Sequence, residues 1–300
     1  MSTIKITYGI AKNNIDVTEI CYSRLQNNGI ILIPHNDSTR AGLFTDPLHR
    51  IKKSIFISIN DITTEYQENF NIMINTKDNT VSTIDENIMN EKLKKIQSTM
   101  TLNYGLFNVE IPEQKMVLKY LTGNEKVLEL GANIGRNTLI IASILKKQNN
   151  NNFVTFECDK NIASQLTQNR DINNFTFHIE NNALSKRNLI QRGWDTIVSD
   201  KLLPGYKPVN TITLDELNAK YNIAFDTLVL DCEGAFYYIL LDMPEIINNV
   251  NLIIMENDYH DLSKKQEIDN ILKANGFYRD YYEGGGWGPC RDFFFEVWKK

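Results

Sequence analysis

A run of small and polar residues could hold a nucleotide-like ligand. It reads Glu129-Leu-Gly131-Ala-Asn133-Ile-Gly135-Arg-Asn137, and it separates a short apolar segment from an apolar helical pattern. Glycine lacks a Cβ, so Gly131 and Gly135 allow a sharp turn and a close backbone approach to a ligand. A helix that begins behind a glycine turn at a strand end typically binds a nucleotide or a related molecule.

The polar residues around this turn favour S-adenosylmethionine over a dinucleotide. A dinucleotide fingerprint needs glycine where Asn133 stands. A carboxylate at Glu129 would repel a pyrophosphate, but it suits the cationic amino and sulfonium groups of S-adenosylmethionine. Glu157 ends the next predicted strand, where an acid accepts ribose hydroxyls. Asn182 follows the third strand at the expected position of the adenine, and Asn137 in the first helical turn completes the predicted cofactor set.

The tips of the next two predicted strands carry acids that could do chemistry. Asp231 and Glu233 follow the apolar segment 228–230, and Glu256 ends the following strand, with His260 just beyond. Methylation of a hydroxyl requires removal of a proton, which a positioned carboxylate or histidine can accept. We therefore predict Asp231, Glu233, Glu256 and His260 as catalytic candidates, with Asp231 also near the cofactor.

The same acids could bind a metal ion. Asp231, Glu256 and Asp258 offer hard oxygen ligands of the kind that Mg²⁺ prefers. Acids at strand tips are common without a metal, so a divalent cation is an alternative and no metal is predicted.

Aromatic residues near the expected cleft are candidates for substrate contact. Trp287 stands in the glycine-rich segment 283–290, where the backbone can lie close over a ligand and the indole can stack on a sugar. Tyr206, between the third and fourth strands, is a weaker candidate for the same role.

Alternating strand and helix patterns must position these residues. From residue 126 onward the order predicts an α/β fold with a parallel sheet covered by helices, which two final strands close as an antiparallel hairpin. The predicted strands are Val127–Leu130, Phe153–Glu157, Phe175–Ile179, Asp226–Asp231 and Asn251–Glu256, and the helices are Asn137–Lys147, Lys160–Arg170, Leu214–Tyr221, Ala235–Leu241 and Ser263–Asn275.

The first part of the chain has a different pattern. Short alternating segments with turn signals predict a small β-rich domain over residues 1–84, a helical connector over 85–103 and the α/β domain over 104–300. The segment 35–47 reads as a long polar loop. Its Asp37, Arg40 and Asp46, with His49, could bind a sugar or be held by internal hydrogen bonds.

Composition limits the remaining possibilities. The 300 residues carry a net charge of −5 and no basic tract, so DNA or other strong phosphate binding is not expected. The four cysteines are scattered, which predicts free thiols in a reducing compartment. No apolar run approaches the ~20 residues of a membrane span. We expect a cytoplasmic protein, and a homo-oligomer is compatible with the sequence.

Three segments together resemble FkbM-type methyltransferases. They are 128–135 with its Glu-Leu-Gly-Ala-Asn-Ile-Gly loop, 211–217 with Thr-Leu-Asp-Glu-Leu, and 230–235 with Asp-Cys-Glu-Gly-Ala. The resemblance covers about 104–298. It implies the Rossmann-like class I methyltransferase fold and S-adenosylmethionine-dependent O-methylation of a sugar or glycan. The chain departs from the family at Phe236, where a glutamate is usual, and in the apolar residues before Asp231.

The N-terminal residues resemble a module of proteins from large DNA viruses and some bacteria. The similarity rests on Tyr8-Gly9, Asp16-Val-Thr18 and Thr45-Asp-Pro47, and for a viral protein it would imply the host cytoplasm.

Two other functions remain open. An RNA cap 2′-O-methyltransferase would use a Lys-Asp-Lys-Glu tetrad, for which Lys115, Asp231 and Glu256 could supply three members. The third possibility is a non-catalytic glycan-binding protein with a degenerate methyltransferase fold.

Overall fold

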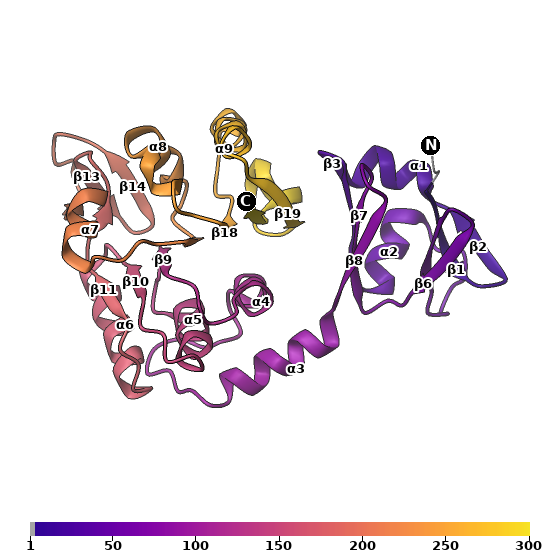
Figure 1. Cartoon of the computed structure of the whole chain (residues 1–300), viewed down its shortest axis with the longest axis horizontal. Coiled ribbons are helices and arrows are strands. Elements are labelled where there is room, and N and C mark those ends of the chain that lie inside the picture. The colour runs from indigo at the N-terminus through magenta and orange to yellow at the C-terminus, as the bar shows by residue number, and fades with distance from the viewer. Residues whose placement is uncertain (1–3) are drawn as a thin grey trace. The chain divides into compact units, whose positions relative to one another are not determined.

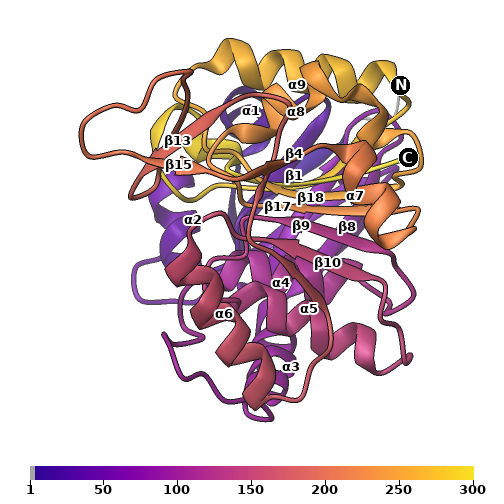
Figure 2. The same cartoon turned by 90° about the vertical axis from the view of Figure 1, so that its left-hand side faces the viewer.

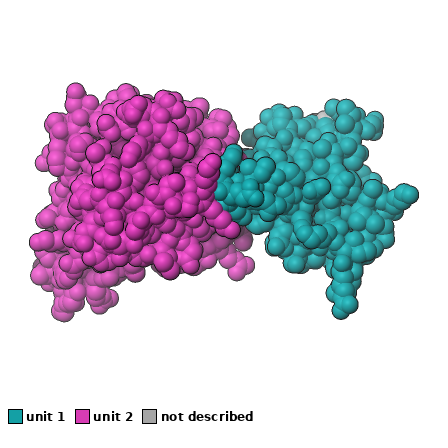
Figure 3. Space-filling model, turned by 90° about the horizontal axis from the view of Figure 1, so that it is seen from below, with its two compact units in different colours: residues 1–92 teal, residues 93–300 magenta. Residues whose placement is uncertain are grey.

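The computed structural model of the chain describes residues 4–300 and divides into two compact units, residues 1–92 and 93–300 (Figure 3). Helix α3, Glu86–Gln97, contains the boundary between them. None of the helices in residues 4–300 has the length and the apolar character that a membrane crossing requires.

A seven-stranded sheet forms the centre of the second unit. Its order is β11-β10-β9-β17-β18-β20-β19, and the first five strands are parallel while β20 runs antiparallel to both of its neighbours. The strands are β9 Val127–Leu130, β10 Phe153–Phe156, β11 His178–Glu180, β17 Thr227–Leu230, β18 Leu252–Glu256, β19 Tyr278–Glu283 and β20 Phe295–Lys299. The strand order reverses between β9 and β17, where open α/β sheets bind their ligands.

Helices cover both faces of this sheet. In Figures 1 and 2, α4, α5 and α6 lie on one face, and α8 and α9 lie on the other. The helices are α4 Ile111–Tyr120, α5 Arg136–Lys146, α6 Lys160–Ile172, α7 Leu214–Tyr221, α8 Ala235–Asp242 and α9 Leu262–Ala274, with short 3₁₀ turns η2 Pro244–Ile247 and η3 Gly288–Phe293. The predicted Rossmann-like sheet with a terminal antiparallel hairpin is confirmed.

The central strands are buried on both faces, as parallel strands between two helical layers must be. Every residue of β9, β10 and β17 is buried, including Glu129 and Thr155. Side chains also cap the N-terminal ends of two helices. Thr213 and Glu216 form a capping box at the start of α7, and Asp159 caps α6.

An insertion between β11 and α7 was not predicted as strands. It holds β12 Ala183–Leu184 paired with β16 Thr211–Ile212, and a three-stranded sheet of β13 Leu189–Arg192, β14 Asp195–Val198 and β15 Lys207–Val209. Most of the side chains in these strands are partly or fully exposed. The strands are two to four residues long, so they give no extended apolar run in the sequence.

The first unit is β-rich, as predicted. It contains two four-stranded antiparallel sheets, in the orders β2-β1-β5-β6 and β3-β4-β7-β8. The strands are β1 Lys5–Ile10, β2 Asn13–Asp16, β3 Gln26–Asn27, β4 Ile30–Ile33, β5 Ser54–Ile59, β6 Ile62–Tyr66, β7 Phe70–Asn75 and β8 Thr80–Asp85. Helical segments α1 Thr18–Ile20, η1 Cys21–Leu25 and α2 Asp37–Phe44 complete it.

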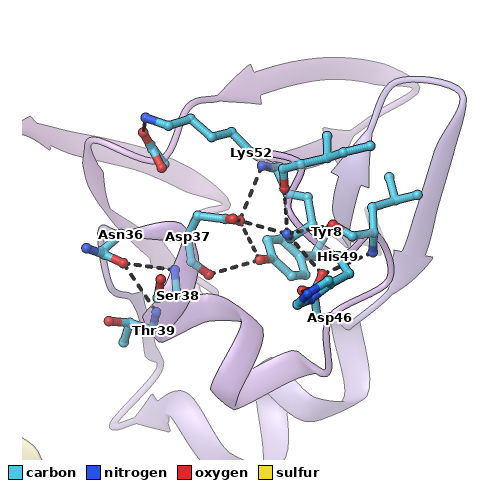
Figure 4. Close-up of polar contacts among 12 residues, drawn as sticks. Tyr8, Asn36, Asp37, Ser38, Thr39, Asp46, His49 and Lys52 are labelled. Carbon is cyan, nitrogen blue, oxygen red and sulfur yellow. Dashed lines mark hydrogen bonds and ion pairs between the residues drawn. The ribbon is translucent and has the colours of Figure 1, made fainter.

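Helix α2 corrects the prediction of a long polar loop over 35–47. Asn36 caps this helix by accepting hydrogen bonds from the backbone N–H groups of Ser38 and Thr39 (Figure 4). Arg40 is fully buried, and its guanidinium donates to the carbonyl oxygens of Pro34, Gln67 and Phe70. The polar residues of the helix therefore serve the fold of this unit.

The acids of the same segment are also bonded internally. Asp37 accepts a hydrogen bond from the Tyr8 hydroxyl at 2.6 Å, and the buried Lys53 ammonium lies 3.1 Å from Asp37 and 2.9 Å from Asp46. Figure 4 shows the Tyr8–Asp37 bond and places Asp46 near by, with His49 beside it. Of the internal-bonding and sugar-binding alternatives, these contacts favour the first.

Candidate functional site

A cavity of about 540 Å³ opens at the carboxyl ends of β9, β10 and β17. This volume lies in the range of small-molecule sites, roughly 300–1,000 Å³. The predicted residues that line it are Gly131, Asn133, Glu157, Asn182, Asp231 and Glu233. The insertion and α8 supply apolar walls, among them Leu184, Ile197, Val198 and Met243.

The glycine loop is shaped by a backbone contact between two strand ends. Gly131 has φ +91°, and a Cβ on it would lie 1.5 Å from the carbonyl oxygen of Asp231. Only glycine fits there. Asn133 also has a left-handed backbone, with φ 49°, and Gly135 begins α5 with φ 95°. The loop is thus held in one conformation at the mouth of the cavity.

Glu157 ties this loop to the end of β10. Its Oε2 accepts a hydrogen bond from the Asn133 backbone N–H at 3.0 Å, and its Oε1 accepts one from the Asp159 N–H at 2.8 Å. Burial raises the pKa of Glu157, and these bonds partly offset the rise. Carboxylate oxygens have further lone pairs, so Glu157 can still accept from a ligand's hydroxyls.

Asn182 lies on the adjoining wall. Its amide donates to Glu180 Oε2 at 2.8 Å, while Glu180 also accepts from Lys220 and Tyr221. The asparagine is therefore held in one orientation beside the cavity.

Glu129 lies behind the loop and does not line the cavity. It is buried, and it accepts a hydrogen bond from Thr155 Oγ1 on the adjacent strand at 2.6 Å. Burial raises its pKa to about 7. Gly135 and Asn137 are likewise absent from the cavity wall, and the Asn137 Oδ1 is buried without a hydrogen-bond partner.

Four acids converge beside the cavity at the tips of β17 and β18. Oxygen atoms of Asp231, Glu256 and Asp258 lie within 4.8 Å of one another. Glu113, from the first turn of α4, lies next to Glu256. Burial and the neighbouring acids raise the pKa of Glu256 to about 11 and of Asp258 to about 7, and they raise that of Asp231 well above its usual value.

A more exposed group lies at the rim of this acidic cluster. The rings of His260 and Trp287 are 4.6 Å apart, and Trp287 is 44% exposed. Glu233 has a left-handed backbone, with φ 50°. Burial raises its pKa, while the charge of the nearby His260 lowers it. Three predicted residues from different loops are therefore close together.

Tyr206 lies in the insertion, away from these residues. Its hydroxyl donates to Asp195, and its ring stacks on the Arg192 guanidinium at 4.7 Å. It does not line the cavity.

Sequence reasoning missed Asn169 on α6, which is fully buried. Its Oδ1 accepts from the backbone N–H groups of Asn103 and Tyr104, and its Nδ2 donates to the carbonyls of Tyr104 and Ile134. A polar residue on the inward face of an amphipathic helix is the only sequence signal it gives. Glu113 and Glu110 were also missed, because they precede the first strand of the sheet.

The comparisons with known proteins find similar solved structures but no sequence match. No family model matches the chain, and no curated protein matches it. An O-methyltransferase from Bacillus cereus in complex with SAH shares 14% identity with a TM-score of 0.41, over 71% of this chain and 91% of that one. A ribosomal protein L11 methylase from Lactobacillus delbrueckii shares 12% with a TM-score of 0.40, over 66% and 81%. Likeness at this level does not define an activity.

The Gly131 contact predicts a large stability loss on substitution. In Gly131→Ala the methyl group meets the Asp231 carbonyl, so the strand ends must separate. Gly276→Ala is the matched control, because Gly276 has φ +86° and open space around its Cβ position. We expect the control to lose about 1 kcal/mol from the left-handed backbone alone, and Gly131→Ala to lose at least ~3 kcal/mol from the added steric overlap.

Urea unfolding followed by tryptophan fluorescence measures this difference, since Trp194, Trp287 and Trp298 all lie in residues 93–300. Equal losses in the two variants would contradict the backbone contact.

The raised pKa of Glu129 predicts a pH-dependent stability. Between pH 4.5 and about 7 the carboxyl is ionised in the unfolded chain but protonated in the fold. The folded state then binds more protons, so the free energy of unfolding falls as pH rises, by up to about 3 kcal/mol for this group. The Glu129→Gln variant lacks this carboxyl, so its free energy of unfolding should not show this fall with pH.

The measurement is the difference between wild-type and variant unfolding free energies at pH 4 to 8. The same pH slope in both proteins would show that Glu129 titrates normally.

Proposed function

We propose that the chain is an S-adenosylmethionine-dependent O-methyltransferase that acts on a sugar hydroxyl of a glycan or nucleotide sugar. The observation that carries the proposal is the cavity at the reversal of strand order, with the glycine loop and Glu157 on one side and Asp231 and Glu233 on the other. Open α/β sheets bind ligands at this position.

The residues in the cavity fit the parts of S-adenosylmethionine. Glu157 would accept the ribose hydroxyls, and Asn182 with the apolar Leu184 and Met243 would hold the adenine. The carboxylate of Asp231 suits the positive charges of the methionine portion. Glu129 would act indirectly, because it lies behind the loop and not on the cavity wall.

S-adenosylmethionine, when bound, supplies a methyl group on a positively charged sulfur. The protein's part is to hold the acceptor in line and to take its proton. Glu233 and His260 are the best-placed bases, since both are exposed, whereas Glu256 and Asp258 are more buried. On methyl transfer to the hydroxyl oxygen the sulfur–methyl bond would break to leave S-adenosylhomocysteine, and Glu233 or His260 would take the proton of the hydroxyl.

The pair of rings supports a sugar as the acceptor. The Trp287 ring lies 4.6 Å from that of His260 at a tilt of 49° and is partly exposed, and Glu233 lies near His260. An indole face packs against the apolar face of a pyranose, and a neighbouring carboxylate accepts its hydroxyl groups.

Cofactor binding is the first test. Calorimetric titration with S-adenosylmethionine and S-adenosylhomocysteine should give a single site. Glu157→Ala should weaken binding about 30-fold, the effect of ~2 kcal/mol in lost hydrogen bonds to a charged group. The control Asp171→Ala, at an exposed acid on α6, should change binding less than about 2-fold. No binding to the folded wild-type protein would overturn the proposal.

Acceptor recognition is the second test. Release of S-adenosylhomocysteine is measured across a panel of sugars, nucleotide sugars and capped RNA. Trp287→Ala should raise the KM for the sugar about 10-fold by removing ~1.4 kcal/mol of stacking. Its affinity for the cofactor should change little. Trp287→Tyr keeps an aromatic ring, so its KM should lie between those of the wild type and Trp287→Ala. Turnover on capped RNA alone would reject a sugar acceptor.

A further inference from the structure

We propose that Asp231, Glu256 and Asp258 bind one divalent cation, Mg²⁺ or Mn²⁺, at the tips of β17 and β18. From the sequence, a divalent cation at these three acids is only an alternative, and the comparisons assign none. The binding itself is independent of methyl transfer, whereas its role in catalysis rests on the function proposed above.

The geometry matches a single cation. One oxygen from each of the three carboxylates lies within 4.8 Å of the other two. Ligand oxygens at 2.0–2.1 Å from an octahedral Mg²⁺ are ~3–4 Å apart, and those around a larger cation are up to ~5 Å apart. The three oxygens can therefore reach one ion with small side-chain rotations.

The three ligands come from two neighbouring strands. Asp231 follows β17, Glu256 ends β18, and Asp258 follows two residues later. Because β17 and β18 pair in parallel from Thr227–Leu252 to Leu230–Met255, their carboxyl ends are held side by side. The backbone thus fixes the spacing of the ligands.

A fourth side chain provides an independent indication of a missing partner. Glu113 on α4 is only 8% exposed, and its Oε2 is buried without a hydrogen-bond partner. Its carboxyl lies beside that of Glu256. A buried carboxylate oxygen without a donor is costly, and a cation in the cluster, directly or through a bound water, would satisfy it.

No basic side chain balances these acids. Across residues 4–300, none of the ion pairs involves Asp231, Glu256, Asp258 or Glu113, while the nearby Glu110 is paired with Arg136 at 2.6 Å. Acids gathered in this way are stable only when protonated or when paired with a positive charge.

Another buried acid in the same unit, unlike those of the cluster, is paired with basic side chains. Glu296 is fully buried, but Lys265 lies 2.9 Å from it and Arg279 lies 2.6 Å from it. Trp298 donates a further hydrogen bond at 2.9 Å. The contrast indicates that the cation for the Asp231 cluster comes from outside the chain.

The ligand set also selects the ion. All three groups are carboxylates, with no histidine or cysteine among them. Hard oxygen ligands favour Mg²⁺, Mn²⁺ or Ca²⁺ over Zn²⁺ or Cu²⁺.

If the chain methylates a sugar, this ion narrows the acceptor class. Its remaining coordination positions can take two oxygens of the acceptor. A vicinal diol would then chelate the cation through two oxygens. The cation would lower the pKa of the hydroxyl that is aimed at the methyl group, and Glu233 or His260 would take its proton. Acceptors with adjacent free hydroxyls should be preferred over those in which one is blocked.

Cation binding is tested on the full chain after removal of metals with EDTA and without S-adenosylmethionine. Titration with Mn²⁺, followed by the electron paramagnetic resonance signal of the free ion, should show one site, and Mg²⁺ should displace it. Asp258→Asn and Glu256→Gln should each weaken Mn²⁺ binding at least about 10-fold through loss of a charged ligand.

Glu267→Gln is the matched control. Glu267 is an exposed acid on α9 that bonds Tyr237, so its variant should keep the wild-type affinity. Circular dichroism melting shows that each variant is folded, and both cluster variants should melt at or above the wild-type temperature in EDTA because each removes one of four crowded carboxyl groups.

Parallel calorimetry with S-adenosylmethionine in EDTA separates the two proposals. Absence of saturable Mn²⁺ binding, or binding unchanged in Asp258→Asn and Glu256→Gln, overturns the cation site even if the cofactor binds. Mn²⁺ binding with the expected variant effects, but no cofactor binding, supports the cation site and rejects the methyltransferase.

Discussion

The site depends on one close approach between two backbones. Gly131 ends β9 and lies against the carbonyl of Asp231 at the end of β17, where any Cβ would lie 1.5 Å from that oxygen. Gly131 begins the glycine loop, and Asp231 belongs to the acidic cluster. A shift of either strand end would move both groups of residues, so their relative position is set by the sheet itself and not by flexible loops.

The centre of the sheet could be predicted from sequence because β9, β10, β17 and β18 are short, mostly apolar runs that end in, or are followed by, an acid or glycine. The limits of β9 and α7 are as predicted. The third strand begins at His178 and not at Phe175, because Phe175 and Phe177 pack in the loop that precedes it. The strands of the insertion are only two to four residues long, and helix α2 begins with the polar residues Asp37 to Arg40, so hydrophobic periodicity could not reveal them.

Prediction of the site worked where a residue follows a strand, because parallel strands end at one edge. Asn133, Glu157, Asn182 and Asp231 line the cavity for this reason. The prediction was less accurate for Glu129, whose side chain bonds Thr155 on the adjacent strand and does not line the cavity. Glu113 comes from a helix before the sheet, and only the three-dimensional packing brings it to the cluster.

Asn169 has a consequence for how the site can open. Its single amide group bonds the backbone of residues 103 and 104 and the carbonyl of Ile134 in the glycine loop. Loss of this buried asparagine from its place would leave four backbone groups without partners at once. The two segments are therefore expected to exchange their amide hydrogens as one cooperative unit, so the glycine loop should not open independently of residues 103 and 104.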